Sequence, residues 1–277
     1  MNTPINILAT LDGNYVKYFT VMLSSLADSN PGEYFEVYIL RGREELELSA
    51  AEKLLAGRGA VHQIEIAEDR LADAPTTDRY PREMYYRIFA AKYLPDTLDR
   101  ILYLDPDLIV NGSLRELYDT PMGDNYFAAA SHIGKVLTLV NELRLDMPDE
   151  GSYINSGVML INLALLRRDQ DIQAVFDYIE AHRGKLILPD QDIISGLYGD
   201  RIIPLDPYRY NMTERLFVLH RQNIGKLDVE SVRERSAIIH YCGRNKPWKS
   251  SYIGKLGVFY DEALSRAREK LPELDFS

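Results

Sequence analysis

The sequence predicts an α/β fold built on a mainly parallel sheet, and three observations support this prediction. Short strand-like runs alternate with helical patterns through the first half of the chain, an order typical of a parallel sheet covered by helices on both faces. The 277 residues are 46% hydrophobic and 27% charged, which is enough apolar material for a large core. No run reaches the roughly 18 consecutive apolar residues that a membrane-spanning helix needs.

The first half is expected to alternate strands and helices. The turn residues Asn30, Pro31 and Gly32 separate the first helix from the second strand. Pro95 ends the third helix, and a polar loop over 68–79 precedes that helix. The expected strands are 5–11, 34–40, 60–67 and 100–104, and the expected helices are 15–27, 44–55 and 82–93.

The second half is less regular. Two long connections, 133–152 and 206–225, are of the kind that carries binding function rather than regular structure. Since no linker or repeat interrupts the chain, we expect one domain over 1–277. The expected strands are 126–130, 158–162, 201–205 and 237–241, and the expected helices are one long amphipathic helix over 165–182 and a final helix over 258–270.

Charge and cysteine usage narrow the class of protein. Lys and Arg total 32 against 42 Asp and Glu, a formal net charge of −10, which disfavours nucleic acid as a partner. The single cysteine, Cys242, has no internal partner for a disulfide, as is usual in a reducing compartment. Asp12 interrupts the first apolar run, and no basic flank precedes it. We therefore expect a cytoplasmic protein, with no basic amphipathic tail to support membrane docking.

The first candidate for chemistry is Asp105-Pro106-Asp107, directly after the apolar run 101–104. Residues i and i+2 of a strand point to the same side, so both carboxylates can face one cation. Carboxylate oxygens suit Mg²⁺ or Mn²⁺, and ligands gather at the carboxyl ends of strands in open α/β sheets. An acidic turn after a buried strand explains the same residues without a metal.

The second candidate runs from His240 to Trp248. A histidine at a strand end can bind a metal through a neutral ring nitrogen. Gly243 permits close approach of the backbone to a ligand, and Lys246 offers a positive charge to a phosphate. The polar, turn-rich segment 243–251 is expected to be only marginally ordered.

The third candidate follows the first strand. Asp12 and Asn14 can read the hydrogen-bonding edges of a base or ribose, and Tyr15 can stack on a ring. The same residue types are ordinary at helix N-caps and turns. The Gly-x-Gly-x-x-Gly fingerprint is absent from this corner, which weighs against an NAD enzyme.

Two more motifs and one arginine complete the candidates. Asp190-Gln191-Asp192 opens a helical stretch, where acidic residues are also expected from the helix dipole. Asn155-Ser156-Gly157 enters a buried strand, where turn chemistry is an equal explanation. Arg87 sits on an apolar helix and needs an anionic partner or ligand, unless it reaches the surface.

Taken together, these features resemble the retaining glycosyltransferase family 8, which includes bacterial galactosyl- and glucosyltransferases and glycogenin. The resemblance extends from about Asn6 to Trp248, and its specificity comes from five motifs in the family's order. These motifs are Leu-Asp-Gly-Asn-Tyr at 11–15, Tyr-Leu-Asp-Pro-Asp at 103–107, Asn-Ser-Gly-Val-Met-Leu-Ile-Asn at 155–162, Asp-Gln-Asp at 190–192 and His-Tyr-Cys-Gly-x-x-Lys-Pro-Trp at 240–248.

The resemblance implies a GT-A fold, with a nucleotide-sugar and metal-binding half over about 1–132. An acceptor-binding half and a C-terminal closing segment would follow over about 133–277. It also implies UDP-glucose or UDP-galactose as donor, Mn²⁺ or Mg²⁺ as cofactor, and a carbohydrate or lipid-linked glycan as acceptor. Carried over by position, the implied residues are Asp105, Asp107 and His240 for the metal, Asp12, Asn14 and Tyr15 for uridine, Gly243 and Lys246 for the pyrophosphate, and Arg87, Asn155, Ser156, Asp190 and Gln191 around the donor sugar.

The implied mechanism depends on Gln191. A retaining glycosidase uses a carboxylate as nucleophile, whereas the matching residue here is an amide, which is a feeble nucleophile. We therefore expect same-face attack by the acceptor hydroxyl, with the leaving phosphate oxygen taking its proton. Gln191 would stabilise the oxocarbenium-like sugar through its carbonyl oxygen.

Two departures from the family pattern and two rival functions remain. Pro106 stands where an apolar residue is commoner, and His132 stands where galactosyl members have an acidic acceptor contact.

A phosphatase of the haloacid dehalogenase type also has Asp-x-Asp after an apolar strand, with the first Asp as nucleophile. A non-catalytic sugar-nucleotide-binding protein would keep the uridine and metal residues but lack Asp190 and Gln191.

Overall fold

The computed structural model describes residues 3–66, 71, 74, 76, 82–224 and 227–276. Most of the expected loop over 68–79 lies outside these residues. The strands are β1 (Ile5–Thr10), β2 (Phe35–Arg41), β3 (Gly59–Glu65), β4 (Arg100–Leu104), β5 (Leu108–Val110), β6 (Phe127–Ala130), β7 (Val158–Asn162), β8 (Ile202–Leu205) and β9 (Ile238–His240).

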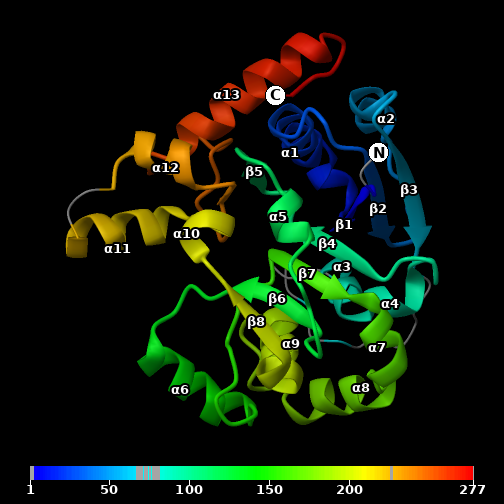
Figure 1. Ribbon diagram of the computed structural model, residues 1–277, viewed down its shortest axis with the longest axis vertical. Coiled ribbons are helices and arrows are strands. Elements are labelled where there is room, and N and C mark those ends of the chain that lie inside the picture. Colours follow the sequence, from blue (N-terminus) through cyan, green and yellow to red (C-terminus); the bar gives the residue numbers. More distant parts are fainter. Residues whose placement is uncertain are drawn as a thin grey trace.

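The helices surround these strands (Figure 1). Those before β7 are α1 (Val16–Ser29), α2 (Ser49–Leu55), α3 (Glu83–Tyr86), α4 (Ala90–Tyr93), α5 (Arg115–Tyr118) and α6 (Lys135–Leu145). Those after it are α7 (Leu163–Asp169), α8 (Ile172–Ala181), α9 (Pro189–Tyr198), α10 (Pro207–Tyr210), α11 (Glu214–Ile224), α12 (Val229–Arg235) and α13 (Gly257–Lys270). Three short 3-10 helices are η1 (Gly13–Tyr15), η3 (Arg87–Phe89) and η4 (Gly199–Arg201).

The described residues form a seven-stranded sheet in the order β3-β2-β1-β4-β7-β6-β8. Strands β1 to β4 are mutually parallel where they pair, and β6 is parallel to β8. Only β7 runs antiparallel to its neighbours β4 and β6 within this sheet. The predicted mainly parallel α/β sheet is therefore confirmed.

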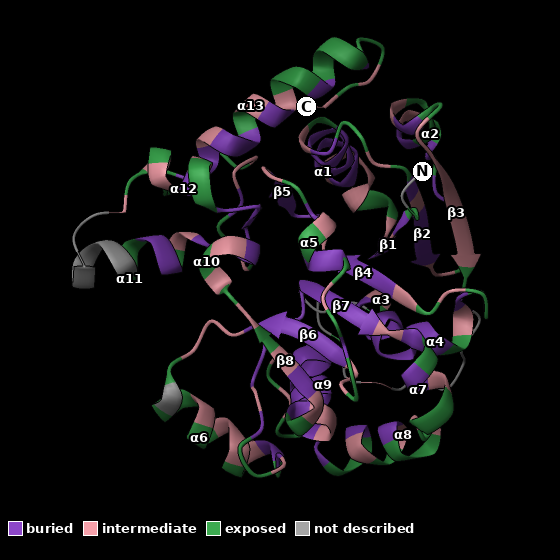
Figure 2. Cartoon of the chain, viewed as in Figure 1, coloured by how far each residue is buried: buried purple, intermediate pink, exposed green. Residues whose placement is uncertain are grey.

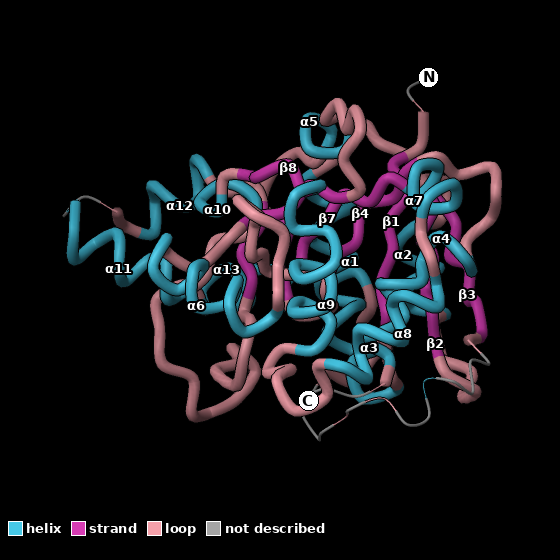
Figure 3. The backbone as a smooth tube through the Cα atoms, turned by 90° about the horizontal axis from the view of Figure 1, so that it is seen from below, coloured by secondary structure: helices cyan, strands magenta, loops and turns pink. Residues whose placement is uncertain are grey.

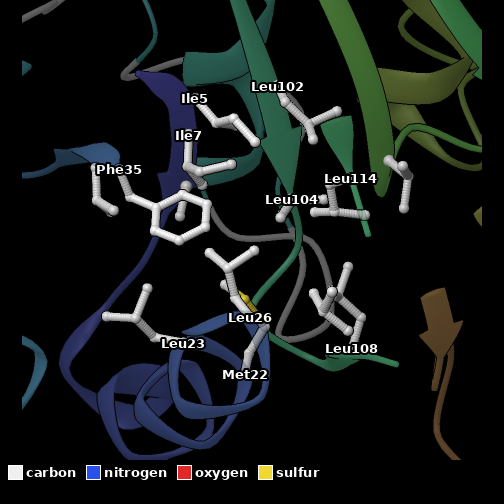
Figure 4. Close-up of a cluster of buried hydrophobic side chains, with 14 of the residues drawn as sticks. Ile5, Ile7, Met22, Leu23, Leu26, Phe35, Leu102, Leu104, Leu108 and Leu114 are labelled. Atoms are coloured by element: carbon white, nitrogen blue, oxygen red, sulfur yellow. The ribbon is translucent and has the colours of Figure 1, made fainter. Parts of the chain in front are cut away.

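The alternation of side chains along each strand separates two apolar layers. Residues Ile5, Ile7 and Phe35 pack with α1, α2 and α5, whereas Leu8 and Tyr103 pack with helices α3, α4 and α7 to α9. Figure 4 shows the first layer, with side chains of α1 directed at β1 and β2. Figures 1 and 3 show the sheet between α1 on one side and α8 and α9 on the other.

A small second sheet positions the C-terminal part of the chain. Strands β5 and β9 pair antiparallel, with Leu108 opposite His240. Helix α13 packs on the outer side of α1, where Val21 meets Phe259 and Ala263 in a third apolar cluster. The β5–β9 pairing brings residues near 240 to the end of β4, although they are more than 130 positions away in the sequence.

Several elements differ from the predicted ones. The expected helix over 165–182 is two helices, α7 and α8, because Gln170 is extended and Asp171 caps α8 by accepting from the backbone N–H groups of Gln173 and Ala174. The expected helix over 82–93 contains the 3-10 segment η3. Helix α2 begins at Ser49 rather than at 44.

The two long connections do contain helices, contrary to expectation. Helix α6 lies in 133–152, and α10 and α11 lie in 206–225. Helix α6 shows no apolar periodicity toward the core: Leu145 is buried, whereas Val136 and Leu143 are largely exposed. Figure 2 shows much of α6 in the colours of exposed and intermediate residues. Among the described residues, no helix is both long and apolar enough to cross a bilayer.

Candidate functional site

The candidate site lies where β4 ends and β9 ends. Asp105 directly follows β4, and its backbone N–H donates to the carbonyl of Gly157 at 2.8 Å. Asp107 directly precedes β5, and the β5–β9 ladder places His240 beside it, with the N–H of Tyr241 donating to the carbonyl of Asp107 at 3.0 Å. Backbone pairing therefore brings together two motifs that are far apart in the sequence.

The donor atoms of Asp105, Asp107 and His240 all lie within 4.8 Å of one another. We call these three residues the cation group. His240 Nε2 lies 3.2 Å from Asp107 Oδ1 and 3.6 Å from Asp105 Oδ2. Both His240 Nε2 and Asp107 Oδ1 are buried without a hydrogen-bond partner among the described residues. A buried polar atom left in this way costs about 1–3 kcal/mol, and a divalent cation bound between the two would offset that cost.

The chemistry of the cation group fits a divalent metal. Two carboxylates and one imidazole match the ligand preferences of Mn²⁺, and the carboxylates also suit Mg²⁺. Lys246 contacts the group through an ion pair with Asp107 and donates to the carbonyl of Tyr241 at 2.8 Å. Burial alone would raise the pKa of Asp107, but Lys246 and His240 hold it well below its usual range. Asp107 is therefore ionised and ready to bind a cation.

Gly157 is required at this place by close packing. A Cβ atom at Gly157 would lie 2.3 Å from His240 Cε1 and 2.6 Å from Asp105 Oδ2, which is closer than real contacts allow. Because only glycine leaves room for both side chains, Gly157 is part of the site, although the motif analysis did not assign it a role.

As its position on an apolar helix predicted, Arg87 has anionic partners. Its Nη1 lies 3.0 Å from Asp105 Oδ1 and 3.2 Å from Asp190 Oδ2, and its guanidinium lies over the ring of Tyr103. Ser156 Oγ donates to the same oxygen of Asp190 at 2.8 Å. Burial raises the pKa of Asp190, and Arg87 opposes that rise. Arg87 thus connects the cation group to the start of α9.

Gln191 and Asn155 adjoin this cluster. Asn155 Nδ2 donates to Gln191 Oε1 at 3.3 Å, and Asn155 Oδ1 accepts from the backbone N–H of Gly157 at 3.3 Å. Asn155 Oδ1 also accepts from Asn211 Nδ2 at 2.9 Å. The sugar-side residues predicted from two separate motifs are therefore joined by hydrogen bonds.

Asp192, the third residue of the Asp-Gln-Asp motif, points elsewhere. It is fully buried and accepts five hydrogen bonds: two from Arg144 at 2.8 Å each, one from Tyr153 at 2.7 Å, and those of the backbone N–H groups of Ile187 and Leu188 at 2.7 and 3.1 Å. We call Asp192, Arg144 and Tyr153 the Asp192 cage. It attaches α6, which carries Arg144, to α9.

The proposed uridine residues lie at the corner between β1 and α1. Asp12 is the N-cap of η1, where its Oδ1 accepts from the backbone N–H of Tyr15 at 3.2 Å. Asn14 Nδ2 donates to Asp12 Oδ2 at 3.5 Å. The capping explanation therefore holds for Asp12. Burial raises the pKa of the Tyr15 phenol, the charge of Lys246 opposes that rise, and the charges of Asp107 and Asp105 add to it, so Tyr15 lies within electrostatic range of the cation group.

The segment 243–251, which was expected to be only marginally ordered, makes defined packing contacts. Gly243 has a φ of 88°, a left-handed conformation that favours glycine. Trp248 stacks on Tyr18 with ring centroids 3.8 Å apart. The side chain of Asn245 bonds the backbone of Ile253 twice, at 2.7 and 3.0 Å. Aromatic stacking on α1 thus compensates for the polar composition of this segment.

Sequence reasoning missed Asn211 and the environment of His132. The Nε2–H of His132 donates to the carbonyl of Asn211 at 2.9 Å, and burial lowers the pKa of His132 to about 4. His132 is therefore neutral near pH 7. The only signal for Asn211 was its place in the long connection 206–225, because no motif included it.

Comparison with known proteins agrees with this geometry. A galactosyltransferase, LgtC, solved in complex with donor and acceptor sugar analogs, superposes with a TM-score of 0.80 and 25% identity, covering 94% of this chain and 95% of that one. The fold is thus the GT-A fold, and the protein is a glycosyltransferase. The chain belongs to glycosyl transferase family 8, whose model matches residues 6–251. The phosphatase and non-catalytic alternatives are accordingly set aside.

Two of the similar curated proteins are named as lipopolysaccharide glycosyltransferases, and a third is named as a stress protein. A lipopolysaccharide 1,2-glucosyltransferase of Escherichia coli is 27% identical over 247 residues, which cover 88% of this chain and 73% of that protein. A lipopolysaccharide 1,3-galactosyltransferase of Salmonella typhimurium is 25% identical, covering 95% and 78%. General stress protein A of Bacillus subtilis is 25% identical, covering 89% and 88%.

Proposed function

We propose that this protein is a retaining, metal-dependent hexosyltransferase that moves glucose or galactose from a UDP-sugar to a hydroxyl of a carbohydrate or lipid-linked glycan. The observation that carries the proposal is the pair of partnerless buried atoms, His240 Nε2 and Asp107 Oδ1, which lie 3.2 Å apart at the end of β4. The names of the relatives, which include glucosyl- and galactosyltransferases, support the choice of sugar.

In this proposal Asp105, Asp107 and His240 hold Mn²⁺ or Mg²⁺. When bound, the cation would act as a Lewis acid that neutralises the departing diphosphate. Lys246 brings a further positive charge to the same place, and the conformation of Gly243 lets the backbone approach the pyrophosphate. Asp12, Asn14 and Tyr15 would contact uridine from the neighbouring corner.

The sugar would lie against Arg87, Asp190 and Gln191, and these contacts favour same-face attack. Asp190 is engaged by Arg87 and Ser156, and Asp192 by its cage, so neither carboxylate is disposed to act as a nucleophile. Gln191 would stabilise the oxocarbenium-like sugar through its carbonyl oxygen. The acceptor would enter from the second half, over about 133–277, where neutral His132 replaces an acidic contact.

A donor panel tests this proposal. Sugar nucleotides are incubated with the protein and Mn²⁺, and slow hydrolysis to the free nucleotide is scored with and without EDTA. We expect UDP-glucose or UDP-galactose to react, and only without the chelator. Turnover that persists in excess EDTA, or a preference for another nucleotide, contradicts the proposal.

Gln191→Ala tests the assignment of the sugar side. We expect turnover to fall by about 10²-fold, because a group that stabilises developing charge is lost, while UDP affinity stays within about twofold because, in this proposal, Gln191 would contact only the sugar part of the donor. Gln173→Ala, on the exposed side of α8, is the matched control and is expected to react like the wild type. An equal loss of UDP affinity and turnover would show that Gln191 is wrongly assigned.

A further inference from the structure

Asn211 is a fully buried residue that follows α10 and contacts both sides of the site. Its Oδ1 lies 2.9 Å from His240 Nδ1, and its Nδ2 donates to Asn155 Oδ1 at 2.9 Å. Its backbone carbonyl accepts from His132 at 2.9 Å. A buried side chain with both polar atoms engaged is held in one orientation.

The direction of these hydrogen bonds follows from the backbone. The N–H of Gly157 can only donate, so the Asn155 atom beside it must be the oxygen Oδ1. That oxygen can only accept, so the Asn211 atom that faces it must be Nδ2. The other atom of the Asn211 amide is then Oδ1, which faces His240. Each assignment follows from the preceding one.

The same reasoning determines the tautomer of His240. Because Asn211 Oδ1 can only accept, His240 Nδ1 carries the proton of this hydrogen bond. Nε2, which has no hydrogen-bond partner and faces the cation group, is then the ring nitrogen left to bind a cation. A histidine that binds a metal needs this arrangement, in which a neighbouring acceptor orients the ring.

We propose that Asn211 is a positioning residue that holds His240 ready for the cation and, through Asn155, orients the amide of Gln191. The proposal rests on the proposed function. It deepens that function by joining the metal side and the sugar side through one chain of hydrogen bonds, from His240 through Asn211 and Asn155 to Gln191.

Two substitutions separate the two ends of this chain. Asn211→Ala removes both contacts. Asn211→Asp keeps an oxygen acceptor for His240 but replaces the Nδ2 donor with an oxygen, so that Asn155 Oδ1 loses the hydrogen bond from Asn211. Asn30→Ala is the matched control, since Asn30 is also a buried asparagine that bonds the backbone, at Leu26 and Leu114, in another part of the fold.

Affinity for Mn²⁺ in the presence of UDP is measured by the electron paramagnetic resonance signal of free Mn²⁺, and kcat is measured alongside. Asn211→Ala is expected to weaken Mn²⁺ binding by about 10-fold or more, the usual effect of losing an outer partner of a ligating histidine. Asn211→Asp is expected to keep Mn²⁺ affinity within about threefold but to lower kcat by about 10-fold. Asn30→Ala is expected to change neither.

The tautomer supplies a readout that does not depend on turnover. Long-range proton–nitrogen NMR with Mg²⁺ and UDP, assigned with His240→Gln, is expected to show His240 protonated on Nδ1 in the wild type. Asn211→Ala is expected to change that signature, and Asn211→Asp to keep it. Should Asn211→Ala fail to fold, the wild-type tautomer and Asn211→Asp decide the matter.

The outcomes are distinguishable. Wild-type His240 protonated on Nε2, or Asn211→Ala with unchanged Mn²⁺ affinity, overturns the role of Asn211 and leaves the proposed function standing. Unchanged kcat in Asn211→Asp overturns the connection to Gln191. A wild-type protein that binds no divalent cation overturns the proposed function, and this inference with it.

Discussion

The cation group and the Asp192 cage are both buried carboxylate clusters, yet they differ in how their polar atoms are satisfied. In the cation group, Asp107 Oδ1 and His240 Nε2 have no hydrogen-bond partner among the described residues. In the cage, Asp192 accepts five hydrogen bonds from protein groups. Burial of a carboxylate alone therefore does not indicate function, whereas buried polar atoms without partners that converge on one place do.

The two aspartates of the Asp-Gln-Asp motif of α9 belong to different clusters. Asp190 contacts Arg87 on the side of the cation group, and Asp192 contacts Arg144 on the side of α6. Because residues i and i+2 of a helix point about 200° apart, one motif contributes to the site and to the scaffold at once.

The largest expected effect is on the cation group. Asp107→Ala is expected to abolish detectable Mn²⁺ binding with UDP and to lower turnover by at least about 10³-fold, because several kcal/mol of charge stabilisation is lost. Mn²⁺ titration and a donor-hydrolysis assay measure the two effects. Asp119→Ala, on the surface, is the matched control. Near-normal activity of Asp107→Ala would remove the distinction between the two clusters.

A smaller effect, on stability rather than chemistry, is expected in the cage. Asp192→Asn leaves Arg144 without its carboxylate and places an amide donor among five donors, so the free energy of unfolding should fall by about 3–5 kcal/mol. Urea denaturation measures this fall, and Mn²⁺ affinity of the folded protein should not change. A variant with wild-type stability that has lost turnover would show that Asp192 acts in the chemistry.

The smallest expected effect is on the pH dependence of stability, and it comes from His132, which contacts Asn211. Burial lowers the pKa of folded His132 to about 4, below the value of about 6.5 in an unfolded chain. The unfolded state therefore binds more protons between these values. The stability that His132 contributes is complete above about pH 6.5 and is lost as the pH falls toward 4, by about 1–3 kcal/mol.

Urea denaturation of wild type and His132→Gln at pH 7 and pH 4.5 measures this contribution. Glutamine keeps a donor for the carbonyl of Asn211 but does not titrate, so its stability should depend less on pH across this range. Equal pH dependence of the two proteins would contradict the assigned environment of His132.

Much of the fold was predictable because local patterns report local structure. The strands up to β4 appear within two residues of their expected ends, and their order is that of a parallel sheet. The split between α7 and α8 was not predicted, because Asp171 falls within a continuous apolar period and its capping role depends on an extended Gln170. The same applies to α6, whose apolar residues other than Leu145 are largely exposed or partly exposed and so follow no core-facing pattern.

By itself, the sequence determined the fold class, the family motifs and the pairing of Asp105 with Asp107, since two carboxylates two residues apart after a strand share one side. It also indicated that Arg87 needs an anionic partner. Only the tertiary structure decided which partners are used: the β5–β9 ladder places His240 beside Asp107, Gly157 leaves room for both, and Asn211 joins His240 to Asn155. The physical reason is that hydrogen bonds between distant segments depend on how the layers pack, and no periodicity along the chain records that packing.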